Sequence, residues 1–562
     1  MINKWPFSFA LTLFAGLFAV TSLLAQENPE TERWRTDPRL TEGQIAPILE
    51  GLGDHSLPVT AKTPRAQLFF DQGLRLTYGF NHAEAVRAFR EAARLDPDCG
   101  MAYWGTALAL GPNINSRMNQ ENGRKAYQAV RKAAALKGRL TDKERGFIEA
   151  LAARYAEDPE AERPPLDQAY ADAMRNLAQR YPDDPDVLTL FAASVMNVNP
   201  WPGHEYWNKD GSPRPGTEEF TGVLERVIRH FPDHAGGHHY YIHAVEASTQ
   251  PDLAEKSADL LSKLMPGAGH IVHMPSHIYI RVGRYADATL SNQLAVSADE
   301  DYITQCAAQG LYPAGYYPHN IHFLWAAAER EGRSRLAIES ARKVASKVPH
   351  EMHSERANFL LPPLYVLVRF GKWDEILQEP RPAVDASPLY KGMWHYARGM
   401  ALRGTKRLKE ADKELKQLIK VIESPHIEDA WAQSNPASRV LSLARNMLAG
   451  EIAAKRGKQD EAIALLSAAV RFEDGLTYTE PPDWDFPVRQ SLGAVLLEAE
   501  RDFEAEVVYW EDLRRNPENG WSLFGLLQAL RRQGKEQEAQ LVEERLKKAW
   551  AKADITLSGS RF

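Results

Sequence analysis

The residues of this 562-residue chain whose type and position favour metal chemistry are its histidines. Eleven of the 17 histidines lie between His204 and His322, near the middle of the chain. Only two cysteines are present, Cys99 and Cys306, and they are too few and too far apart for a disulfide framework or a thiolate metal cluster. A metal site in this chain must therefore use imidazole and carboxylate ligands.

Two pairs of histidines have a spacing that lets both side chains bind one ion. His239 and His243 are four residues apart, as are His273 and His277. On a helix, such side chains stand about 5–6 Å apart at Cβ, and each imidazole nitrogen binds a metal at about 2.0–2.1 Å. Glu246 follows His243 by three residues, so one helix can offer two nitrogens and one oxygen.

The elements that must position these residues are helices that recur in pairs. Residues 67–97 contain two amphipathic stretches, a short break at 79–81 and a final proline. Five residues of this segment have counterparts at the same spacings near the other end of the chain. The first set is Gly73, Ala85, Phe89, Ala92 and Pro97, and the second is Gly493, Ala505, Tyr509, Asp512 and Pro517.

This pattern resembles the 34-residue tetratricopeptide repeat (TPR), in which small residues let two antiparallel helices approach. The resemblance implies an all-α fold, a TPR α-solenoid in which helix pairs stack into a superhelix with a concave groove. It covers about residues 66–550. The expected organisation is a signal peptide at 1–25, an extended lead-in at 26–65, N-terminal repeats at 66–198, central histidine-rich repeats at 199–350, C-terminal repeats at 351–550 and a tail at 551–562.

In this family, positions 2, 5, 9 and 12 of each first helix line the groove. Alignment of the three central repeats places His239, His243, Glu246, His270, His273, His277, His319, His322 and Glu329 at such positions. Seven histidines thus occupy twelve positions, whereas the chain-wide frequency of 17 in 562 predicts fewer than one. Pro275 is tolerated in a first helical turn, so we expect that helix to start near His273 or Met274, with His270 in the approach.

We interpret the nine residues as a His/Glu metal centre for a divalent transition metal such as zinc, copper or iron. The set exceeds the ligands of one ion, so one or two ions remain open. Catalysis is also open: a metal-dependent hydrolase or oxidoreductase would use Glu246 or Glu329 as ligand or general base, acting on a small-molecule substrate. The alternatives are a metal storage or delivery protein, and a non-catalytic scaffold that binds a protein or peptide in the groove.

Other residues near the centre favour different interpretations. His238 occupies a position that packs between helices, so we expect a structural role. His350 and His353 lie at a repeat junction and are weaker candidates for shielding the site. The aromatic residues of 201–207 suggest either a lid over the groove or a surface loop packed by its own rings.

The N-terminus has the layout of a secretory signal: Lys4, an apolar run over residues 7–20 and a small residue at Ala25. We expect cleavage after Ala25, a periplasmic or secreted protein and no membrane segment in the mature chain. A retained anchor is the alternative, although the run is shorter than the ~20 residues of a spanning helix. The net charge of -7 provides no positive field for nucleic acid.

Overall fold

The structure is a computed structural model that describes residues 44–198, 206–306, 312–348 and 356–562. The predicted signal peptide, His350, His353 and residues 201–205 of the proposed lid lie outside these ranges. The chain divides into two compact units, Met1–Pro47 and Ile48–Phe562, and every described helix belongs to the second. Residues 48–63 precede the first described helix.

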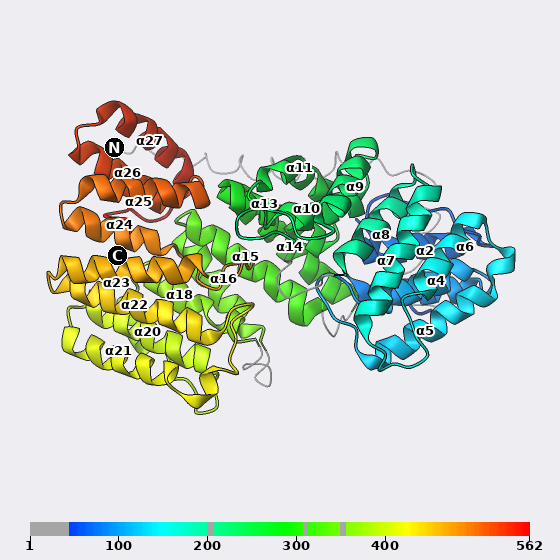
Figure 1. Cartoon of the computed structure of the whole chain (residues 1–562), viewed down its shortest axis with the longest axis horizontal. Coiled ribbons are helices and arrows are strands. Elements are labelled where there is room, and N and C mark those ends of the chain that lie inside the picture. Colours follow the sequence, from blue (N-terminus) through cyan, green and yellow to red (C-terminus); the bar gives the residue numbers. More distant parts are fainter. Residues whose placement is uncertain (1–43, 199–205, 307–311, 349–355) are drawn as a thin grey trace, which may run out of the picture. The chain divides into compact units, whose positions relative to one another are not determined.

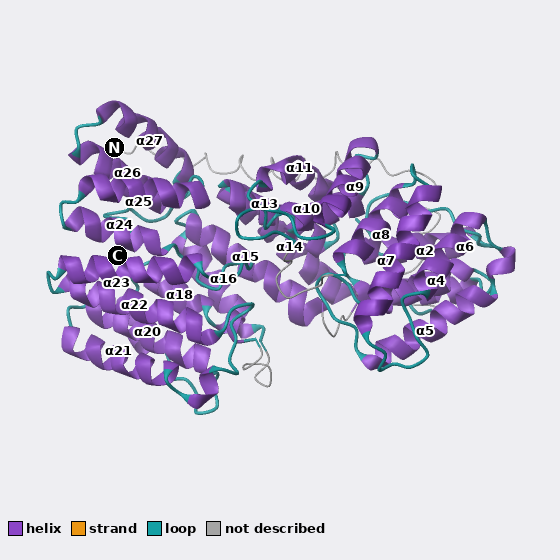
Figure 2. Ribbon diagram, in the orientation of Figure 1, coloured by secondary structure: helices purple, strands orange, loops and turns teal. Residues whose placement is uncertain are grey.

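The described part of the chain is built from α-helices and contains no β-strand, only three isolated β-bridges (Figure 2). The all-α fold class expected from the repeat pattern is therefore confirmed. None of the described helices combines the length and the apolar character that crossing a membrane requires.

Consecutive helices pack against each other as antiparallel pairs, which is the arrangement of a TPR-like α-solenoid (Figure 1). The first four pairs are α2 (Pro64–Tyr78) with α3 (His82–Leu95), α4 (Gly100–Leu110) with α5 (Gln120–Ala135), α6 (Asp142–Ala152) with α7 (Arg163–Arg180), and α8 (Pro185–Met196) with α9 (Thr217–His230).

The central helices are α10 (Ala235–Val245) with α11 (Glu255–Leu264), α12 (Gly269–His273) and α13 (Pro275–Val282) with α14 (Tyr285–Cys306), and α15 (Tyr317–Arg330) with α16 (Ser334–Ser346). The later helices are α17 (Ala357–Leu360), α18 (Pro362–Arg369), α19 (Trp373–Gln378), α20 (Pro388–Gly404), α21 (Leu408–Ile422), α22 (Ala437–Lys455), α23 (Gln459–Asp474), α24 (Val488–Glu498), α25 (Asp502–Arg515), α26 (Gly520–Arg532) and α27 (Glu536–Ala549).

The recurring glycines permit the close approach of neighbouring helices. A Cβ on Gly73 of α2 would lie 2.7 Å from the ring of Phe89, and one on Gly105 of α4 would lie 2.4 Å from the same ring. Near the other end of the chain, a Cβ on Gly493 or Gly525 would lie 2.4 or 2.1 Å from the ring of Tyr509. The shared spacing therefore reflects one packing unit, an aromatic ring held between glycines of two successive first helices.

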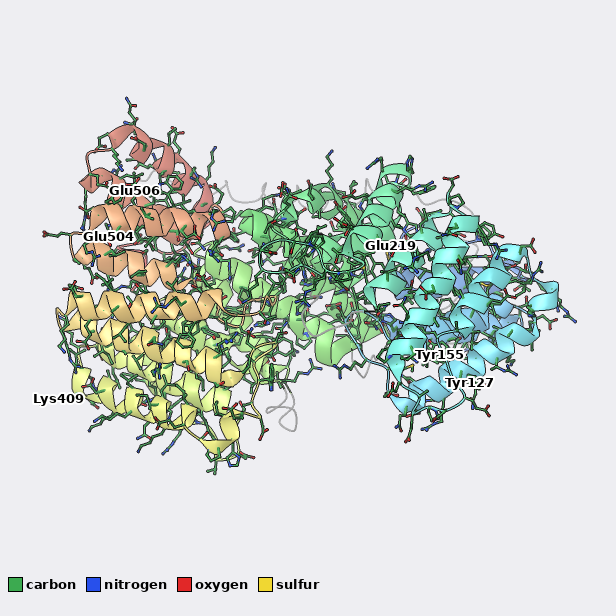
Figure 3. The ribbon with its side chains drawn as sticks, viewed as in Figure 1. Tyr127, Tyr155, Glu219, Lys409, Glu504 and Glu506 are labelled. Carbon is green, nitrogen blue, oxygen red and sulfur yellow. The ribbon has the colours of Figure 1, made fainter. Side chains whose placement is uncertain are left out.

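Charged side chains lie on the outer faces of the helix pairs. Figure 3 shows Glu219 on α9, Lys409 on α21 and Glu504 on α25, and all three are exposed. The central first helices bury histidine side chains. His239 and His273 are fully buried, at 0% exposure.

Candidate metal centre

Six of the predicted ligands form two adjoining sets, which we name the first and second histidine groups. The first group is His239, His243 and His270, and the second is His273, His277 and His319. Within each group, one ligand atom from each residue lies within 4.8 Å of the other two. The helical spacing identified in the sequence brings together His239 with His243, whose ring centroids are 5.0 Å apart, and His273 with His277, at 4.8 Å.

His270 joins the first group because α12 begins earlier than the sequence suggests. The expected start near Met274 holds for α13, which begins at Pro275 with Met274 as its N-cap, but the short helix α12 (Gly269–His273) precedes it, so His270 is itself helical. The backbone nitrogen of His270 donates to the hydroxyl of Tyr312 at 3.1 Å, which ties the start of α12 to the next repeat. The His270 ring lies 5.0 Å from His239.

Hydrogen bonds at Nδ1 orient the rings of the first group. His239 Nδ1 donates to the Tyr78 carbonyl at 2.6 Å, and His243 Nδ1 donates to Glu246 Oε1 at 3.0 Å. Because a carbonyl or an ionised carboxylate can only accept, each Nδ1 must carry the proton. His239 Nε2 and both nitrogens of His270 are buried without a hydrogen-bond partner among the described residues.

The second group has the same kind of support. His273 Nδ1 donates to Asn292 Oδ1 at 2.6 Å, and the Asn292 amide donates to the Ala288 carbonyl at 2.8 Å, which identifies Oδ1 as the acceptor. His277 Nδ1 contacts Glu246 Oε2 at 2.5 Å. The Nε2 atoms of His273 and His277 then face each other at 2.8 Å, so either a proton or a metal ion must lie between two lone pairs.

Burial and mutual repulsion keep most of these imidazoles neutral, which is the form that binds metal. Burial, reinforced by neighbouring histidines, holds the pKa values of four of them well below the ordinary 6.5. These are His239, His270, His273 and His319. His277 differs: burial lowers its pKa, but Glu480 and Glu246 outweigh that effect and raise it to about 10, so a metal ion that binds its Nε2 must displace a proton.

Glu480 is a member of the site that the sequence did not reveal. Its carboxylate forms an ion pair with His277 Nδ1, and Glu246, His277 and Glu480 form a further set of close ligand atoms. Burial and the charge of Glu246 raise the pKa of Glu480 to about 8. Glu480 precedes α24 in a non-helical segment, so no helical spacing connected it to the histidines.

Phe80 is a second unexpected neighbour. It ends the turn between α2 and α3 with φ of 56°, a left-handed conformation that costs energy for a bulky residue. Its ring is buried and lies 4.3 Å from that of His239, 5.7 Å from His243 and 5.4 Å from His270. Phe80 therefore closes the first histidine group with an apolar wall.

Two of the predicted residues lie outside the ligand sets of the described chain. His322 stacks on Trp325, with ring centroids 5.2 Å apart and planes 10° from parallel, and burial lowers its pKa to about 3. Glu329 forms buried ion pairs with Arg369 and Arg330. These contacts give Glu329 a place in an ion-pair network rather than beside the histidine groups.

Other histidines have structural contacts. His238 bonds to the Ser257 hydroxyl at 2.8 Å and the Pro232 carbonyl at 2.7 Å, in agreement with the expected structural position. Asp186 Oδ1 lies 2.8 Å from His55 Nε2 and accepts from the Tyr78 hydroxyl at 2.7 Å. This network holds Tyr78, whose carbonyl orients His239.

Two cavities open onto the histidine groups. A cavity of about 410 Å³ is lined by His243 and His270 of the first group and by His277 and His319 of the second. Glu246, Glu480 and the aromatic rings of Tyr316, Phe359 and Tyr478 complete much of its wall. A second cavity, of about 960 Å³, shares His277 and Glu480 with the first. The centre is thus accessible to small molecules of the size that such cavities accept.

Comparisons with known proteins add only remote structural likenesses. No protein family and no curated protein matches the chain. The human IFIT1 dimer with m7Gppp-AAAA is 11% identical and covers 87% of this chain and 91% of its own, with a TM-score of 0.31. Yeast Tom70 is 11% identical and covers 86% of this chain and 91% of its own, with a TM-score of 0.27. The P58(IPK) TPR domain is 13% identical and covers 84% of this chain and 99% of its own, with a TM-score of 0.22. The solenoid fold therefore rests on the helix pairs and repeated glycine–aromatic contacts of the chain itself.

Proposed function

We propose that this protein is an exported metalloprotein that holds a divalent transition metal, such as zinc, copper or ferrous iron, in its histidine groups. The observation that carries the proposal is the shared arrangement of His239 and His273. Each ring is fixed through Nδ1 by an oxygen acceptor, which leaves Nε2 available toward neighbouring imidazoles. Metal-binding histidines commonly have such a partner on the nitrogen that does not bind the ion.

The donor set fits a transition metal better than calcium or magnesium, because imidazole nitrogens outnumber carboxylates. The unpartnered nitrogens of His239 and His270 support the same conclusion, since a buried polar atom without a partner costs about 1–3 kcal/mol. A bound ion would satisfy them. It would also supply Lewis-acid chemistry, or redox chemistry if it is copper or iron.

Two glutamates would assist the metal in different ways. Glu246 orients His243 and His277 through its two oxygens, and Glu480 presents a carboxylate at the wall of both cavities. In a hydrolase or an oxidoreductase, Glu480 is thus better placed than Glu329 to accept a proton from a molecule in either cavity. The cavities point to a small-molecule substrate.

The test is elemental analysis of protein purified without a histidine tag, with and without the substitutions His239→Ala and His273→Ala together. We expect stoichiometric metal in the native protein and its loss in the double variant. His395→Ala serves as control because His395 pairs with Glu414 on α20 and α21 and is absent from every ligand set of the described chain. The control should keep its metal.

A metal-free native protein with an intact helical fold would contradict the proposal. It would leave the alternative of a scaffold that binds a protein or peptide partner. Metal binding without turnover of any small-molecule substrate would instead identify a storage or delivery protein.

A further inference from the structure

We infer that the centre holds two metal ions, one in each histidine group. The inference rests on the proposed metal-binding function and goes beyond it by assigning the ligands to separate ions. The first ion would be bound by His239, His243 and His270, and the second by His273, His277 and His319.

The ligand atoms of each group lie within 4.8 Å of one another, so small shifts of the side chains would bring all three onto one ion. Two ligands of the same ion cannot lie farther apart than twice the metal–nitrogen distance, which is about 4.2 Å for imidazole. The close ligand atoms form two separate three-histidine sets rather than a single set of six. A single ion therefore cannot take up both complete groups, whereas three imidazoles are a sufficient protein ligand set for a zinc-like ion with an open position.

Each group also has its own supports. The Tyr78 carbonyl orients the first group through His239, and Asn292 orients the second through His273. Each group is therefore oriented independently of the other, as expected if each binds its own ion. Both groups have the anchored Nδ1 atoms expected of ligands.

Two features join the groups into one centre. Glu246 contacts His243 of the first group at 3.0 Å and His277 of the second at 2.5 Å. The cavity of about 410 Å³ is lined by histidines of both groups. A small molecule in this cavity would thus meet both ions, as in two-metal hydrolases and oxidoreductases.

The experiment loads metal-free protein with excess Zn²⁺, removes loosely bound metal by desalting and counts zinc per chain by mass spectrometry. We expect two ions in the native protein. His239→Gln/His270→Gln should retain one ion, and His273→Gln/His319→Gln should also retain one. Circular dichroism verifies that each variant is folded.

Matched controls lie on the same helices. His238→Gln on α10 and His322→Gln on α15 change buried histidines that belong to neither group, so both should still bind two ions. Native protein loaded with two equivalents of Cu²⁺ gives an independent measurement that needs no variant. Magnetic coupling between adjacent ions should broaden or abolish its electron paramagnetic resonance signal.

The outcomes separate the two proposals. One ion in the native protein, lost when either group is changed, would overturn the two-ion centre but keep the metal-binding function. No ion in folded native protein would overturn both. Two copper ions with full, uncoupled signals would show that the ions are not adjacent and would also overturn the inference.

Discussion

At the scale of single residues, the centre depends on groups that hold the imidazoles as much as on the imidazoles themselves. Glu246 is the clearest case because its two oxygens contact two different histidines. It was expected as a ligand or a general base, and its position in the structure favours an orienting role. That role predicts an effect on metal affinity rather than on folding.

We expect Glu246→Gln to weaken metal binding by about 10- to 100-fold, as loss of a partner that orients a ligand typically does. The neutral amide keeps the shape of the side chain but cannot accept hydrogen bonds at both ends. Competition titration with a chelator measures the change.

Glu329→Gln is the matched control. It removes the charge that faces Arg369 and Arg330, so it should lower stability by about 3–5 kcal/mol and leave metal affinity unchanged. Equal losses of affinity in the two variants would contradict the assigned role of Glu246.

Asp299 predicts a pH dependence of stability near the centre. It accepts from Tyr312 at 2.8 Å and from Asn320 at 2.7 Å, and burial raises its pKa from 3.8 to about 7. Because the folded chain holds this proton more tightly than the unfolded chain, the contribution is fully present below about pH 4 and is lost as the pH rises through 7. The loss is up to about 4 kcal/mol.

Asp299→Asn should remove this component. The measurement compares the melting temperatures of metal-free native protein and of the variant from pH 4 to pH 8. The melting temperature of the native protein should fall relative to that of the variant as the pH rises. Parallel curves for the two proteins would contradict the prediction.

At the scale of elements, turns and helix breaks decide which side chains reach the centre. Most turns of the helix pairs that pass through left-handed backbone use glycine, as at Gly332, Gly371 and Gly457, but the turn after α2 uses Phe80. The break between α12 and α13 lets His270 and His273 precede Pro275 within a short helix of their own. At Phe80, the left-handed backbone costs conformational energy, but it places an aromatic ring against the first histidine group.

We expect Phe80→Leu to destabilise the protein by about 1–3 kcal/mol and to weaken metal binding, because the smaller side chain leaves space against His239 and His270. Thermal melting and zinc affinity measure the two effects.

Lys406→Gly tests the backbone contribution alone. Lys406 has φ of 63° in an exposed turn after α20, so glycine should stabilise the chain by about 1 kcal/mol without changing zinc affinity. A destabilising effect there would show that the left-handed conformation is not strained.

At the scale of the molecule, the centre joins segments from three stretches of the chain. Phe80 and Tyr78 come from the first helix pair, the histidines from the central repeats, and Glu480 from the segment before α24. A solenoid whose repeats contact mainly their neighbours therefore gains long-range contacts at this point.

Export is the prediction that belongs to the whole chain. We expect the mature protein to begin at Gln26, which removes Lys4 and no acidic residue and changes the net charge from -7 to -8. Intact-mass analysis of the protein from the extracytoplasmic fraction measures the cleavage. Full-length protein in the membrane fraction would favour the retained anchor instead.

The sequence alone determined the features that depend on local geometry. Helical periodicity and the glycine–aromatic spacing identified the paired helices, because an α-helix repeats every 3.6 residues wherever it lies. The same periodicity placed His239 beside His243 and His273 beside His277. These four are among the six of the seven expected histidine ligands that come together in the structure.

Only the tertiary structure decided which residues complete the site. His322 follows His319 by three residues, so its side chain points about 60° away from that of His319 around the helix axis. It stacks on Trp325 and does not join the second histidine group. Glu329 lies about 15 Å farther along the same helix, beyond ligand reach. Glu480 and Phe80 reach the centre because distant segments fold against it, and no local periodicity in a sequence records such a contact.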